Sequence, residues 1–178
     1  MSIAQYPLLS QLIRTLKLPI PIPPRLERTQ APWSERPLQG ESIILGAAVG
    51  GLWTDTVLPM LQATGAQVQR SPEETDSHSA LRVLVFDASG INEPNELWAL
   101  YDFFHPRLRR LLPCGRILIL GILPVLATAP ATAATAQALE GFCRILAREV
   151  GYRGITVQLL RVEPGAENRL VESDKLRQ

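Results

Sequence analysis

The feature that most constrains the fold is an alternation of short apolar runs with helical segments, which starts near residue 41. Runs such as residues 117–123 are continuously apolar, as in strands that are buried on both faces. Alternating strands and helices predict one parallel sheet with right-handed crossovers and helices on both faces. The predicted strands cover residues 41–48, 66–69, 81–90, 115–123 and 154–162, and the predicted helices cover 52–64, 94–112 and 132–150.

This chain order predicts about five strands in the spatial order 2-1-3-4-5. Parallel sheets of this kind bind ligands at the carboxyl ends of their strands, near the switch between the first and third strands. The predicted carboxyl edge consists of residues 46–52, 87–92 and 121–131.

The run from Ile117 to Leu139 has 23 residues and no charge, which is long enough for a membrane-spanning helix. However, it contains Gly121, Pro124 and Pro130, and its second half is rich in alanine and threonine. We therefore interpret the run as a buried strand, a loop and the start of a helix, and we expect no contact with a membrane.

The first 40 residues differ from the rest of the chain. Residues 7–18 have leucine and isoleucine at helical spacing, which predicts an amphipathic helix. Residues 19–40 contain six prolines, which predict an extended arm or linker, with Trp33 as its anchor. We expect this segment, 1–40, to precede one folded domain at 41–178.

Composition excludes several classes of function. The net charge of +1 argues against an electrostatic grip on nucleic acid. The N-terminus lacks a basic start and a small-residue cleavage site, which predicts a cytoplasmic protein. Cys114 and Cys143 form no CxxC pair and are expected to be reduced core thiols, and the distant His78 and His105 make a poor metal site.

Three stretches resemble the short-chain dehydrogenases/reductases, over roughly residues 41–165. Residues 138–165 resemble the active-site helix, the next strand and the Pro-Gly turn of that family. Residues 84–91 resemble its strand that ends in Asn-Asn-Ala-Gly, and residues 46–52 resemble its Gly-x-x-x-Gly-x-Gly phosphate loop. The resemblance implies an α/β fold with three layers, Rossmann-like or flavodoxin-like.

The catalytic positions of the family hold other residues here. The tyrosine position is Thr132, the lysine position is Ala136, and the region of the serine includes Gly121 and Ile122. The family needs an acid that protonates a ketone oxygen and a lysine that lowers the pKa of that acid. Threonine and alanine supply neither group, so the resemblance implies an active-site segment without its chemistry.

The cofactor positions of the family are only partly kept. Leu52 replaces the last glycine of the phosphate loop, and Arg70 is the only charged candidate for the adenosine ribose. Asp87 stands at the first asparagine of the Asn-Asn-Ala-Gly motif, where it either binds a ribose or caps the next turn. The vestigial cofactor-binding positions are Gly46, Gly50, Gly51, Asp87 and Gly90.

The most specific resemblance is to the degenerate N-terminal domain of the high-molecular-weight β-ketoacyl-acyl carrier protein reductases. It implies a non-catalytic domain that binds no cofactor tightly, followed in the parent protein by a catalytic domain that uses NAD(P)H. The chain ends without the last strand that the family has, which suggests a fragment. Two alternatives stay open: an NAD(P)-dependent short-chain oxidoreductase, and a flavodoxin-like nucleotide-binding module.

Other residues suggest partners. The resemblance implies a homodimer through the helices at 94–112 and 132–150, where Ala133, Ala134 and Ala138 permit close approach. Arg107, Arg109 and Arg110 are a candidate surface for acyl carrier protein, although a solvated helix face is the default. Asp102 and His105 are three apart on a helix, but no nucleophile joins them. Tyr101, Phe103 and Phe104 are expected in the core or at a subunit contact.

Overall fold

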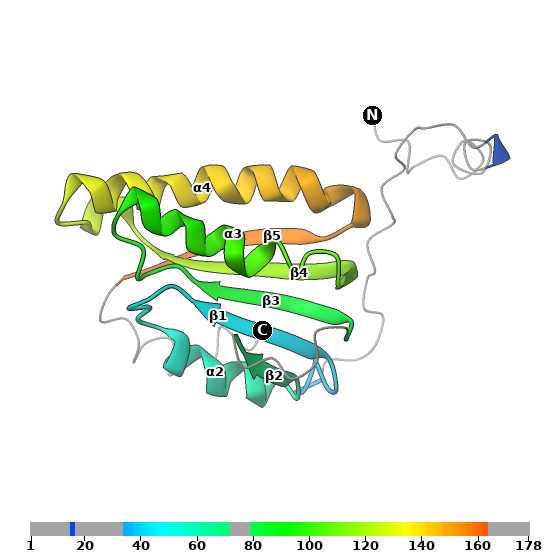
Figure 1. Ribbon diagram of the computed structural model, residues 1–178. Helices are drawn as coiled ribbons and strands as arrows, with labels where there is room; N and C mark the ends of the chain where they lie inside the picture. Colours follow the sequence, from blue (N-terminus) through cyan, green and yellow to red (C-terminus); the bar gives the residue numbers. More distant parts are fainter. Residues whose placement is uncertain (1–14, 17–33, 72–78, 164–178) are drawn as a thin grey trace.

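The fold is built on one sheet of five parallel strands (Figure 1). The computed structural model describes residues 15–16, 34–71 and 79–163. The strands are β1 (Ser42–Ala47), β2 (Gln67–Arg70), β3 (Leu81–Asp87), β4 (Leu111–Ile122) and β5 (Thr156–Val162). Their spatial order is β2-β1-β3-β4-β5, which confirms the predicted order 2-1-3-4-5.

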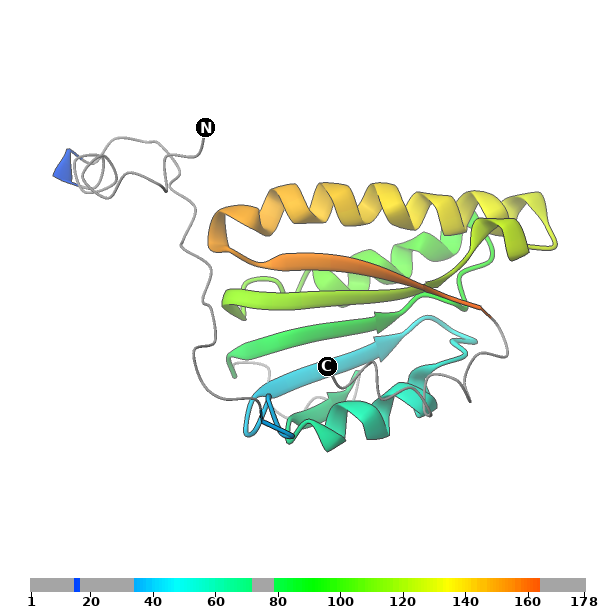
Figure 2. The same cartoon turned by 180° about the vertical axis from the view of Figure 1, so that it is seen from behind.

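Helices cover both faces of this sheet, which confirms the three-layer α/β prediction. They are α2 (Thr54–Ala63), α3 (Trp98–Phe104) and α4 (Pro130–Val150), with 3-10 turns η2 (Pro94–Leu97), η3 (Pro124–Leu126) and η4 (Gly151–Arg153). Helix α3 lies in front of the sheet in Figure 1 and behind it in Figure 2. The apolar clusters place α3 and α4 on one face and α2 on the other.

The strands are apolar on both faces because each face is covered. On the α2 side, Ile43, Leu45, Val83 and Val85 pack against Val57, Leu58 and Leu61. On the other side, the alternate strand residues join a larger cluster with α3 and α4, which includes Ile44, Leu84, Phe86, Ile117, Ile119, Phe103, Phe104, Leu139 and Leu146. The continuous apolar runs in the sequence are therefore the signature of a sheet with two buried faces.

The predicted helix at 94–112 is wrong at its C-terminal end. Helix α3 ends at Phe104, residues 105–110 form turns, and β4 already begins at Leu111. Pro106 has no N–H for the helical ladder and its ring clashes with the preceding turn. The Arg107 guanidinium then donates a hydrogen bond to the Phe103 carbonyl (2.7 Å), which satisfies one of the open acceptors at the helix end.

The uncharged run 117–139 is a strand, a turn and a helix, as predicted. It contributes the second half of β4, the short turn η3 and the first half of α4. The helix begins at Pro130, two residues before the predicted start, because proline suits the first helical position and Ala129 before it is extended. Among the described residues, no helix is both long and apolar enough to cross a membrane.

The N-terminal predictions fall largely outside the described residues. This holds for the helix at 7–18, apart from residues 15–16, for the proline-rich arm up to Trp33, and for His78 in the polar loop. Residues 34–40 are described, and they join the domain at the end of α2. The Leu38 and Gly40 amides donate hydrogen bonds to the Thr64 and Gly65 carbonyls (3.1 and 3.0 Å).

Candidate functional site

A buried carboxylate lies at the centre of the carboxyl edge. Asp87 ends β3 and is fully buried. Its Oδ2 accepts hydrogen bonds from the Trp53 amide (2.7 Å) and the Thr54 hydroxyl (3.2 Å). Its Oδ1 accepts hydrogen bonds from the Ser89 amide (3.1 Å) and the Ser89 hydroxyl (2.6 Å). A buried charge is tolerated only when it is paired or hydrogen-bonded, and four donors meet that need here.

The loop between β1 and α2 is tied to the same residues. The Ala48 amide donates a hydrogen bond to the Asp87 carbonyl (2.8 Å), and the Leu52 amide donates one to the Ser89 hydroxyl (2.8 Å). The Gly51 amide donates to the Ala48 carbonyl (3.0 Å). Three amides of the predicted phosphate loop, those of residues 48, 51 and 52, and the amide of Trp53 directly after it therefore donate to acceptors within the protein.

The structure brings four of the five predicted cofactor positions together. Gly50 turns the loop with φ +76°. A Cβ on Gly51 would lie 2.9 Å from the Asp87 Oδ2, and a Cβ on Gly90 would collide with the Val49 carbonyl. The loop thus lies directly on residues 87–90. Gly46 stands apart from this group, because its missing side chain makes room for the ring of Phe103.

Trp53 is a residue of this edge that the sequence did not reveal. It directly precedes α2, it is fully buried, and its indole packs against Leu120 of β4 and Val162 of β5. None of the described residues accepts a hydrogen bond from its Nε1. Thr54 and Ser89 were also missed. The spacing of Asp87 and Ser89 is a turn signature that could have revealed Ser89, whereas nothing local indicated Trp53.

The three positions that the resemblance assigns to catalysis hold no titratable group. Ile122 is half-buried and packs beside Trp53 on the α2 side of the sheet. Ala136 is buried in α4, and Thr132 is half-buried one turn earlier. The Thr135 hydroxyl donates to the Thr132 carbonyl (2.9 Å) and lies 3.3 Å from the Ile91 carbonyl, so this part of α4 is fastened to the loop after β3.

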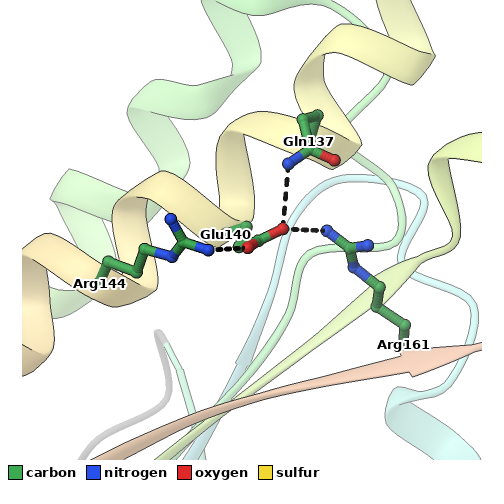
Figure 3. A network of polar contacts seen from close by, with 4 residues as sticks. All are labelled: Gln137, Glu140, Arg144 and Arg161. Atoms are coloured by element: carbon green, nitrogen blue, oxygen red, sulfur yellow. Dashed lines mark hydrogen bonds and ion pairs between the residues drawn. The ribbon is translucent and has the colours of Figure 1, made fainter.

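A polar network fastens α4 to the edge strand β5 (Figure 3). Glu140 accepts hydrogen bonds from Gln137 (3.0 Å), Arg144 (2.5 Å) and Arg161 of β5 (3.2 Å). The Gln137 hydrogen bond and then the charge of Arg144 lower the pKa of Glu140. Gln137 and Arg144 are exposed and Glu140 and Arg161 are half-buried, so the network lies at the surface between α4 and β5.

Cys143 lies one turn after Glu140 on α4. Because its thiol is buried, we expect the folded protein to become less stable at alkaline pH. Burial raises the pKa of Cys143 from 9.0 to about 11. The unfolded chain loses this proton near pH 9 and the folded chain keeps it, so the thiol's contribution is complete below pH 9 and is lost as the pH rises toward about 11. The urea midpoint should fall between about pH 8 and about pH 10.5, and less in Cys143→Ala.

The remaining candidates have structural contacts. Arg107 also donates to the Ser71 hydroxyl (2.8 Å) and lies over the Phe103 ring, and Arg110 donates to the Ser79 carbonyl (3.1 Å). The proposed ribose contact Arg70 instead pairs with Asp55 (2.6 Å). The His105 ring stacks on Tyr101. Within residues 15–16, 34–71 and 79–163, no three His, Cys, Asp or Glu side chains gather to hold a metal ion.

The aromatic residues of α3 divide between the core and the surface. Phe103 and Phe104 lie in the core, as expected, whereas Tyr101 is 47% exposed. Trp98 is 64% exposed, and its ring lies beside that of Tyr101. The helix therefore presents an aromatic surface on its outer side.

Comparison with solved structures identifies proteins that have a similar fold. No family model matches the chain, and no curated protein matches its sequence. A short-chain dehydrogenase/reductase of Serratia marcescens, in a doubly substituted mutant form, superposes with a TM-score of 0.55 at 21% identity, over 73% of this chain and 81% of that one. Another structure of such an enzyme from this organism has a TM-score of 0.52 at 20% identity, over 70% and 74%. The chain therefore has a Rossmann-like fold of the short-chain dehydrogenase/reductase type.

Proposed function

We propose that the chain is a non-catalytic, Rossmann-like domain of a 3-oxoacyl-acyl carrier protein reductase of fatty-acid biosynthesis, which serves assembly or docking. The observation that carries this proposal is which residues stand at the positions that the resemblance assigns to catalysis. Thr132 and Ala136 supply no acid of suitable pKa and no positive charge, and Ala136 is buried. The catalytic domain, with its NAD(P)H, would follow in the parent protein.

The alternative is that the chain is itself an NAD(P)-dependent oxidoreductase. Only the similarity of its fold supports this alternative. The test is the oxidation of NADPH and of NADH by the purified chain with acetoacetyl-coenzyme A as the substrate. We expect the same rate as without protein. Turnover that Thr132→Ala abolishes would overturn the proposal and assign Thr132 a catalytic role. A yellow protein with bound flavin would instead favour the flavodoxin-like module.

We propose a homodimer through the outer sides of α3 and α4. Both helices pack on the same face of the sheet, so their outer surfaces adjoin (Figure 1). Helix α4 exposes Ala134, Ala138, Gly141 and Ile145, which recur at helical spacing and leave room for a close approach. The aromatic rings of Trp98 and Tyr101 supply the apolar area that an interface core needs.

Substitution on this surface should separate the subunits. We expect the wild type to elute with the mass of two chains in light-scattering chromatography. Ala138→Arg should elute with the mass of one chain, because it puts a charge into the centre of the proposed contact. Gln62→Arg, an equal charge change at an exposed position of α2, should leave the dimer intact. A monomeric wild type would contradict the proposed contact.

Acyl carrier protein remains a proposed partner at residues 107, 109 and 110. Because the Arg107 and Arg110 guanidinium groups donate to carbonyl and hydroxyl groups of the domain, the docking proposal depends mainly on Arg109, which is exposed. Titration with acyl carrier protein, wild type against Arg109→Glu, tests it. Binding that is unchanged by this substitution would place the partner elsewhere.

A further inference from the structure

We infer that Asp87 keeps nucleotide phosphates away from the N-terminus of α2, because its own carboxylate occupies the anion position there. The N-terminus of a helix carries a partial positive charge and open N–H groups, and it ordinarily receives phosphate in folds of this kind. Here the group that meets the Trp53 amide (2.7 Å) and the Thr54 hydroxyl (3.2 Å) is a carboxylate from β3. The inference goes beyond the proposed function, which names no residue that excludes nucleotide.

The bonding pattern requires a carboxylate rather than an amide. Two backbone amides, those of Trp53 and Ser89, point at different oxygens of Asp87. A carboxylate has two acceptor oxygens, whereas asparagine has one acceptor and one donor. In Asp87→Asn one of the two amides would therefore face an NH2 group, in either orientation of the side chain. The two amides are therefore both satisfied only when a carboxylate stands at position 87.

The glycines of the loop allow this carboxylate to reach the helix. Gly51 and Gly90 have no side chains, so the loop lies against residues 87–90, and the Asp87 Oδ2 comes close to Gly51. The Leu52 amide, which follows in the loop, is occupied by the Ser89 hydroxyl. A second carboxylate, Asp55, lies in the first turn of α2 and is paired with Arg70. A phosphate at this loop would meet the negative charge of Asp87 at short range, in a setting that water does not screen.

Calorimetric titration with inorganic phosphate and with NADPH, at fixed ionic strength, tests the inference. The proteins are the wild type, Asp87→Asn and Asp55→Asn, with folding checked by circular dichroism. Asp55→Asn is the matched control, since it removes the same charge from the same helix end at an exposed position. We expect Asp87→Asn to bind both ligands at least about tenfold more tightly than the wild type, and Asp55→Asn to gain less than about threefold.

Two results would overturn the inference: a folded Asp87→Asn that binds no better than the wild type, or an equal gain in Asp55→Asn. If Asp87→Asn does not fold, the same titrations with Ser89→Ala test the inference. This substitution frees the Leu52 amide and removes one hydrogen bond to the Asp87 carboxylate. It should gain phosphate affinity, and no gain would reject the inference. Turnover by the wild type tests the proposed function, whereas the difference in affinity between the variants tests the inference, so the two failures are distinguishable.

Discussion

Replacing Trp53 with alanine should lower the free energy of unfolding by about 3–5 kcal/mol. The indole is fully buried on the α2 side of the sheet, where it packs against Leu120 and Val162. Among the described residues, α2 covers the β1 and β3 part of this face, and Trp53 extends that cover to β4 and β5. Its loss would leave a cavity beside the carboxyl ends of two strands. Urea unfolding followed by circular dichroism measures the effect.

Two further variants show whether burial is the cause. Tyr152→Ala removes a large aromatic side chain that is 60% exposed and lies outside the proposed dimer contact, and it should cost less than about 1 kcal/mol. Trp53→Phe keeps an aromatic ring and removes the buried Nε1, for which the described residues supply no acceptor, so it should leave a smaller cavity and cost less than Trp53→Ala does. Equal losses in Trp53→Ala and Tyr152→Ala would show that Trp53 does not hold this part of the domain together.

Asp87→Asn should be the second large effect, with a loss of about 2–3 kcal/mol in the free energy of unfolding. The substitution changes almost no volume, so the cost comes from one buried amide that loses its acceptor and from weaker bonds to a neutral group. The carboxylate joins β3, the turn at Ser89 and the start of α2. We therefore expect the loop between β1 and α2 to lose protection against hydrogen exchange more than the middle of the sheet does.

Asp55→Asn is the comparison for this loss. Its carboxylate pairs with Arg70 at 2.6 Å, but its side chain is 89% exposed. Exposed pairs contribute little, so the change should stay within about 1 kcal/mol. If both substitutions cost the same, the four bonds around Asp87 would not be what stabilises the edge.

Much of the architecture could be predicted from residue patterns because the sheet is buried on both faces. The strands β1, β3 and β4 contain continuous apolar runs, and the helices between the strands have helical spacing. The order of the strands followed from the alternation. The helix predicted at 94–112 extends eight residues beyond the end of α3, because the apolar spacing continues through 108–112 although Pro106 breaks the helix.

The site could be predicted only in part, since its contacts join distant segments. The sequence indicated a turn at Asp87, and the structure shows that turn, with the Ser89 amide bonded to Asp87 Oδ1. The second oxygen reaches Trp53, which is 34 residues away, and no local pattern reports such a contact. Likewise the sequence indicated a solvated basic cluster at residues 107–110, but the carbonyl groups of Phe103 and Ser79 accept hydrogen bonds from Arg107 and Arg110.

By itself the sequence determined the class of fold, because periodicity is a local property of the chain, and the resemblance implied that Thr132 and Ala136 stand where the family has tyrosine and lysine. Only the tertiary structure decided what fills the carboxyl edge. Parallel strands bring the ends of β1 and β3 side by side, and the glycines at 51 and 90 let the loop close on Asp87. The helix N-terminus thereby receives a carboxylate from its own chain, since such a contact depends on distances that only the folded sheet sets.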